Sequence, residues 1–140
     1  MLINKAGENP VADFRLYKYR EEVQIITVQS VEEEALLIGA AYAGIEIFSP
    51  AAYQNWGLGC MQCGVPLIGV ENDVSLAQYR DAAVYAELTE QAIANQMMLL
   101  YKDEALHSEL AAQGQALTAN YTWQHSSQLL WQSILQCGKD

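Results

Sequence analysis

Basic residues are scarce in this chain. Seven Lys and Arg stand against 17 Asp and Glu among 140 residues, which gives a formal net charge of −10, and the seven are scattered along the sequence. Nucleic acids and acidic membranes are bound through clustered Lys and Arg side chains. The composition therefore argues against DNA, RNA and anionic lipid surfaces as partners.

Long apolar runs are also lacking. No stretch of 18 apolar residues occurs, and the N-terminus MLINKAGEN has no basic region followed by an apolar segment. Such a pattern predicts neither a membrane span nor a signal peptide, and it favours a cytoplasmic location.

Potential metal ligands are few. The three cysteines include a C-x-x-C pair, Cys60 and Cys63, and the two histidines, His107 and His125, stand at no metal-ligand spacing. A zinc site needs four ligands, so we expect no metal and no cofactor. A thiol at the start of a helix can be redox-active. The alternative, which we favour, is that both cysteines are small packing residues.

Apolar residues, in contrast, make up 51% of the chain, enough for the core of one domain spanning residues 1–140. Short apolar strands alternate with helices, so we predict an α/β, Rossmann-like domain with a parallel sheet, helices on both faces and a helical C-terminal tail. The expected strands are Leu2–Ile3, Val23–Val28, Ile45–Phe48 and Pro66–Val70. The expected helices are Pro10–Tyr19, one capped by Ser30 and Glu33 and running through Tyr42, Gly59–Gly64, one from Ser75 to Arg80, Thr89–Tyr101, Asp103–Thr118 and Thr122–Gln136. We expect Met97–Leu100 in the core, and Trp123 and Trp131 on a helix face that covers the sheet.

The segment Ile45–Val70 is the most informative. It reads as a strand, a glycine-rich turn, a short helix and a second strand. Without side chains at Gly57 and Gly59, main-chain amides and the following helix N-terminus can approach a phosphate closely. The pattern predicts a nucleotide site at the C-terminal edge of the sheet.

Six blocks in order resemble the C-terminal half of GT-B glycosyltransferases, in particular the family-4 group that uses nucleotide-sugar donors. They are AAYAGIEIFSP (Ala40–Pro50), YQNWGL (Tyr53–Leu58), MQCGVPLIG (Met61–Gly69), VSLAQYRDAAVYA (Val74–Ala86), QAIANQMMLLYKDEAL (Gln91–Leu106) and YTWQHSSQLLWQSIL (Tyr121–Leu135). The resemblance implies a partial donor-binding domain without its first strand and helix and without the acceptor domain. Its expected ligand is a UDP- or GDP-sugar.

The chain departs from this family at residues that matter for chemistry. The two glutamates expected around the glycine turn are replaced, with Gln54 and Gln62 at their places in one alignment and Ala51 and Gly59 in another. Arg80 replaces a glycine. A glutamine carries no charge to stabilise a developing oxocarbenium ion. We therefore predict no catalytic residue and no sugar transfer by this chain.

Two functional classes remain open. In the first, the chain is a glycosyltransferase domain that binds a nucleotide sugar weakly. Its expected binding residues are Gln54, Trp56, Gly57, Leu58, Gly59, Gln62, Ser75 and Leu76. In the second, it is a non-catalytic α/β scaffold or oligomerisation module derived from that family. An uncovered apolar edge near Leu2 and Ile3 favours a homo-oligomer.

Overall fold

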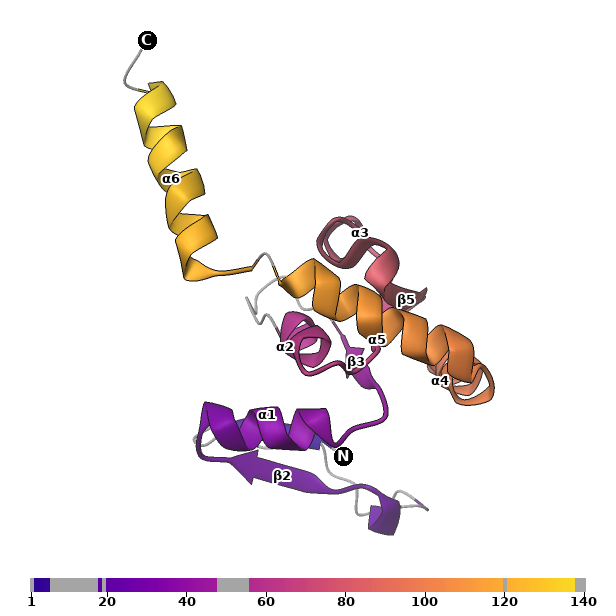
Figure 1. Cartoon of the computed structure of the whole chain (residues 1–140). Helices are drawn as coiled ribbons and strands as arrows, with labels where there is room; N and C mark the ends of the chain where they lie inside the picture. The colour runs from indigo at the N-terminus through magenta and orange to yellow at the C-terminus, as the bar shows by residue number, and fades with distance from the viewer. Residues whose placement is uncertain (1, 6–17, 19, 48–55, 120, 138–140) are drawn as a thin grey trace. The chain divides into compact units, whose positions relative to one another are not determined.

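The computed structural model describes residues 2–5, 18, 20–47, 56–119 and 121–137 (Figure 1). The chain divides into two compact units, Met1–Ala40 and Ala41–Asp140, which we describe separately. Each unit contains parallel strands together with helices. The predicted α/β class with a parallel sheet is therefore confirmed.

The first unit contains strands β1 (Leu2–Lys5) and β2 (Ile25–Val28), which pair in parallel with Leu2 opposite Ile25. Both lie where the sequence predicts strands. A 3-10 turn, η1 (Arg20–Glu22), precedes β2. The helix expected over Pro10–Tyr19 falls, apart from Lys18, outside the described residues, as do the side chains of β1.

Helix α1 (Val31–Gly39) completes the first unit and begins where its capping pattern predicts. The Glu33 N–H donates to Ser30 Oγ at 3.2 Å. In a capping box the Glu33 carboxylate would accept from the N–H of Ser30 itself. Here it accepts instead from the N–H of the preceding residue, Gln29, at 2.8 Å. The helix ends at Gly39, three residues before the predicted Tyr42.

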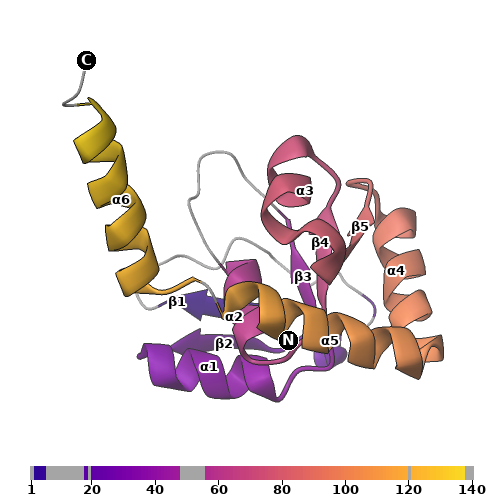
Figure 2. The ribbon, with the colours of Figure 1, turned by 45° about the horizontal axis from the view of Figure 1, so that its top comes forward.

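The second unit is built on three parallel strands in the order β3 (Gly44–Glu46), β4 (Leu67–Val70) and β5 (Ala83–Ala86). Figure 2 shows these strands side by side. Gly44 lies opposite Leu67, and Leu67 opposite Ala83. The strands expected over Ile45–Phe48 and Pro66–Val70 are thus neighbours, with β3 at the edge of the three-stranded sheet. Strand β5 was not predicted, because two of its four residues are alanines, which favour strands weakly.

Six helices belong to the described structure, five of them in the second unit. After α1 they are α2 (Trp56–Gln62), α3 (Asp73–Tyr79), α4 (Glu90–Lys102), α5 (Glu104–Thr118) and α6 (Trp123–Cys137), and a 3-10 turn, η2 (Arg80–Ala82), joins α3 to β5. Asp103 stands between α4 and α5. Its N–H donates to Leu99 O at 3.0 Å at the end of α4, and its Oδ1 accepts from the Leu106 N–H at 2.9 Å at the start of α5.

Neighbouring residues of β4 contact helices on opposite faces of the sheet. Leu67 lies against α2, because a Cβ added to Gly57 would stand 2.8 Å from Leu67 Cδ2. Ile68 packs instead with Leu100 of α4 and Leu110 of α5 in the hydrophobic core. Successive side chains of a strand point to opposite faces. Helices therefore cover both faces of this sheet, as predicted.

Helix α2 begins three residues earlier than predicted. Gly57, Leu58 and Gly59 lie inside the helix and not in a turn before it. The helix ends at Gln62, and its C-terminus is capped by Gly64, whose φ of +73° suits glycine. There the Gly64 N–H donates to Met61 O and the Val65 N–H to Cys60 O, which is the Schellman pattern.

Two expectations about apolar residues are wrong. In the run Met97–Leu100 only Leu100 is buried, and the other three side chains are exposed. The face expected to cover the sheet is also exposed, because no residue of α6 is buried and Trp123 retains 89% of its surface. Helical spacing identified the apolar faces, but it does not say whether an element covers them.

Arg80 adopts backbone angles of φ 49° and ψ −129°, in a region that L-residues occupy at a cost and that glycine reaches freely. This is the position at which the resembled family has glycine. We expect Arg80→Gly to stabilise the protein by about 1 kcal/mol, measured by chemical denaturation. Arg80→Ala, which removes the same side chain but keeps the Cβ, should change stability little. Equal stabilisation by both variants would show that the guanidinium, and not the backbone, is responsible.

Candidate functional site

The last residue of β3, Glu46, lies at the C-terminal edge of the sheet, where open α/β sheets bind ligands. Its side chain is only 8% exposed. Glu46 Oε1 accepts a hydrogen bond of 3.2 Å from the Gly57 N–H in the first turn of α2. Its Oε2 accepts from the Tyr79 hydroxyl at the end of α3. A buried carboxylate is thereby held by a backbone amide and a phenol from two different helices.

Gly57 allows this arrangement because it has no side chain. A Cβ added there would stand 2.6 Å from Glu46 Oε2, 2.7 Å from the Tyr79 hydroxyl and 2.8 Å from Leu67 Cδ2. The close approach that the sequence predicted for Gly57 is therefore made by the protein's own residues. Gly59 differs, because an added Cβ would meet no atom within 4 Å.

Tyr79 is almost fully buried, at 1% exposure. Burial raises the pKa of its hydroxyl, and the hydrogen bond and the charge of Glu46 raise this pKa further. The phenol therefore remains a neutral hydrogen-bond donor to Glu46. Burial, followed by the charge of Asp81, also raises the pKa of Tyr85, whose hydroxyl donates to Arg80 O at 2.6 Å.

The start of α3 is capped by Asn72 and not, as predicted, by Ser75. Asn72 Oδ1 accepts from the N–H groups of Val74 and Ser75 at 3.0 and 2.9 Å. Ser75 is itself buried, and its hydroxyl bonds the carbonyl of Val70 and lies 3.2 Å from that of Asn72. Ser75, which was predicted to bind a ligand, therefore has both its backbone N–H and its hydroxyl engaged within the protein.

The predicted binding residues do not all meet at this edge. Gln54 lies outside the described residues. Trp56 is half-buried at the start of α2, followed by the buried Gly57 and Leu58. Gln62 is exposed at the opposite end of this helix, about 7 Å further along its axis than Gly57. The structure brings Gly57 and Ser75 to the ends of β3 and β4, and leaves Leu76 exposed on α3.

The cysteine pair lies on α2 and just beyond it. Cys60 is buried, and a Cβ on Gly44 would stand 2.7 Å from its Sγ. Close packing of this kind fits the packing role that we favoured for the cysteine. Among the residues that the structure describes, no group of three His, Cys, Asp or Glu side chains could hold a metal ion. None of the described helices has the length and hydropathy to span a membrane.

Glu46 was not among the predicted site residues. The available signal was a single carboxylate in an otherwise apolar strand, Gly-Ile-Glu-Ile-Phe, where a buried charge requires partners. Its partners, Gly57 and Tyr79, follow 11 and 33 residues later, and no local pattern connects them.

No protein-family model matches the chain, and no curated protein is significantly similar to it in sequence. The resemblance to glycosyltransferases therefore stays a prediction.

Proposed function

We propose that this chain is a non-catalytic α/β scaffold, derived from a nucleotide-sugar-binding domain, in which Glu46 takes the place of a bound phosphate. The observation that carries the proposal is the hydrogen bond from the Gly57 N–H to Glu46 Oε1. An amide in the first turn of a helix is the group that a phosphate would use. Here a carboxylate of the same chain uses it.

Charge opposes a second anion at this position. A nucleotide diphosphate would approach an enclosed carboxylate at short range, where like charges repel strongly because water screens them poorly. The next helix start offers no replacement, since Asn72 Oδ1 already accepts from the N–H groups of Val74 and Ser75. Diphosphate binding would have to break these internal hydrogen bonds.

The site also lacks what catalysis of sugar transfer requires. Transfer needs a charge placed where the transition state develops its own. Glu46 is enclosed and hydrogen-bonded to Tyr79, and the sequence has no glutamate from Ala51 to Gln62, where the resembled family has two. The proposal therefore includes no detectable transfer or hydrolysis of a sugar donor.

Weak nucleotide binding is the second candidate function. It is favoured by the open space at Gly59, which follows Gly57 by two residues in α2. A UDP- or GDP-sugar would then bind through backbone amides, with an affinity no better than roughly millimolar to high micromolar.

Titration with UDP and GDP, followed by backbone amide shifts, decides between these candidates. For the wild-type chain we expect no cluster of shifts at residues 57–59 up to millimolar ligand. Glu46→Gln removes the charge and keeps the shape, so any residual anion binding should strengthen in this variant. Glu71→Gln, an exposed carboxylate after β4, is the matched control and should behave as wild type. Saturable wild-type shifts centred on residues 57–59 would overturn the scaffold proposal and favour the second candidate.

A further inference from the structure

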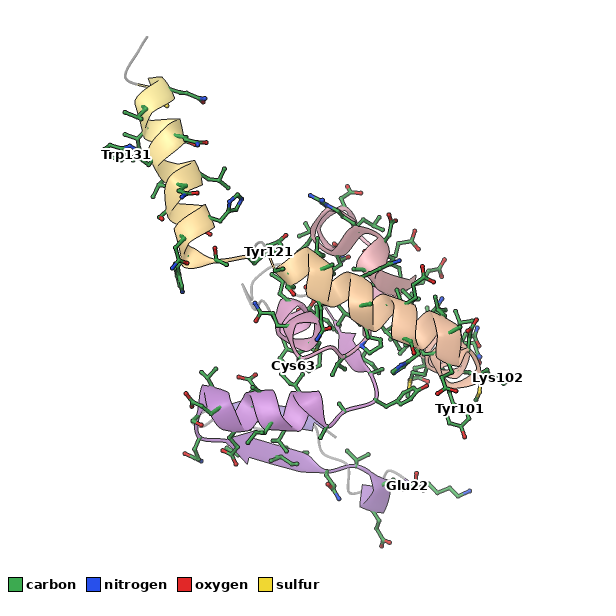
Figure 3. All side chains as sticks on the ribbon, in the orientation of Figure 1. Glu22, Cys63, Tyr101, Lys102, Tyr121 and Trp131 are labelled. Carbon is green, nitrogen blue, oxygen red and sulfur yellow. The ribbon has the colours of Figure 1, made fainter. Side chains whose placement is uncertain are left out.

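Helix α6 exposes an apolar face over its full length. No residue among its 15 is buried, and Leu130 and Ile134 keep 64% and 52% of their surfaces exposed. Figure 3 shows the side chains of this helix, with Trp131 labelled. Burying such side chains is favourable by roughly 1.5–3 kcal/mol each, so an uncovered face of this kind favours association.

The apolar residues of α6 follow the spacing of a two-helix seam. Trp123, Leu130 and Cys137 are seven residues apart, and Ile134 lies four residues after Leu130. At 3.6 residues per turn these four share one stripe, which Trp131 and Leu135 widen on one side. This is the repeat by which the helices of two-stranded coiled coils pack against one another.

The lack of charge on α6 permits a second copy of the chain as its partner. Helix α6 contains no Asp, Glu, Lys or Arg, although the chain carries a net charge of −10. Helices α1, α3, α4 and α5 each contain at least one acid. Two copies of this strongly acidic chain can therefore meet along α6 without opposing carboxylates at the contact, and the helix offers no basic residues to an anionic surface.

We propose that α6 pairs with α6 of a second copy of this chain, through the stripe of Trp123, Leu130 and Ile134. A helix of 15 residues is about 22 Å long, so the pair buries less than the roughly 1,200 Å² of a stable interface. The dimer is accordingly weak and concentration-dependent. Salt strengthens it, because screening reduces the repulsion between the two acidic chains.

The pairing of α6 rests on the proposed function, since a scaffold needs a surface on which to assemble. The pairing and the scaffold proposal are nevertheless tested by different measurements. Assembly is read as molecular mass, whereas nucleotide binding is read as amide shifts. If the chain is monomeric and binds no nucleotide, only the proposed pairing is wrong. If it dimerises and binds UDP, only the proposal of a non-binding scaffold is wrong.

Sedimentation velocity of the full chain, from about 5 μM to about 500 μM, tests the pairing. Wild type should pass from monomer to dimer within this concentration range, and at lower concentration in high salt. Ile134→Glu places two carboxylates face to face in the seam and should weaken the dimer at least tenfold. Gln132→Glu adds the same charge on the opposite face of α6 and is the matched control. It should dimerise nearly as wild type.

Two results would overturn the proposal. One is a wild-type monomer throughout this concentration range. The other is equal weakening by Ile134→Glu and Gln132→Glu, which would assign any association to net charge and not to the stripe. Thermal unfolding at the lowest concentration supplies a second readout. A lower unfolding temperature for monomeric Ile134→Glu would mean that the stripe covers its own chain instead of a second copy.

Discussion

Replacing Gly57 by alanine should destabilise the protein by about 2–3 kcal/mol, because the added methyl group overpacks a closed site. Its Cβ would stand within 2.8 Å of atoms from Glu46, Tyr79 and Leu67. These atoms belong to β3, α3 and β4, so no single side-chain movement relieves all three contacts. Chemical denaturation at neutral pH measures the loss.

Gly59→Ala is the matched control, two residues along the same helix. Its Cβ meets nothing within 4 Å, and alanine is favoured over glycine in a helix interior. This variant should be more stable than wild type by roughly 0.5–1 kcal/mol. Equal stability of the two variants would show that Gly57 is not more closely packed than Gly59. Because a substitution at Gly57 is expected to destabilise the fold, loss of ligand binding in a Gly57 variant would not by itself identify a binding site.

Tyr79→Phe should cost about 2 kcal/mol of stability at neutral pH. The substitution removes a hydrogen bond to a buried carboxylate and leaves Glu46 with one described donor, the Gly57 N–H. Tyr101→Phe, on an exposed tyrosine of α4, should have almost no effect and serves as the control. A cost for Tyr79→Phe as small as that of the control would show that the phenol does not support Glu46.

The difference between wild type and Tyr79→Phe should depend on alkaline pH. The pKa of Tyr79 is raised in the folded protein above its ordinary value of 10.0, so the folded state holds this proton more tightly than the unfolded state. The stability that it contributes is complete below pH 10 and is lost as the pH rises further. The gap between the two proteins should narrow by about 1.4 kcal/mol per pH unit above pH 10. A gap that stays constant to pH 11.5 would contradict the raised pKa.

Local patterns predicted most helix ends correctly. Helices α1, α4 and α5 begin directly after Ser30, Thr89 and Asp103, where the sequence indicates their starts, and each of these residues is the N-cap, because capping depends on residues within four positions of one another. The exposure of α6 was not predictable, since its amphipathic pattern shows that one face is apolar and not whether another element covers it.

The sequence placed Gly57 near the sheet edge but did not identify Glu46 and Tyr79 as its neighbours there. Glycine spacing located Gly57 near the sheet edge, because strand, helix and strand succeed one another within Ile45–Val70. The carboxylate that Gly57 bonds comes from the preceding strand, and the phenol from the end of α3. Contacts between residues far apart in sequence depend on the folded sheet. The glycine pattern therefore predicted space for a ligand next to the Gly57 amide, and in the structure the Glu46 carboxylate occupies this position.

The junction at Asp103 also affects how the chain resists proteolysis. A protease binds several consecutive residues in an extended form, and cleavage concentrates at exposed loops. Between α4 and α5 only Asp103 lies outside a helix, and both its backbone N–H and its carboxylate are hydrogen-bonded to the helices that it joins. Cutting there requires that the end of one helix first unwinds. The segment 90–118 should consequently survive limited digestion as one uncut helical hairpin.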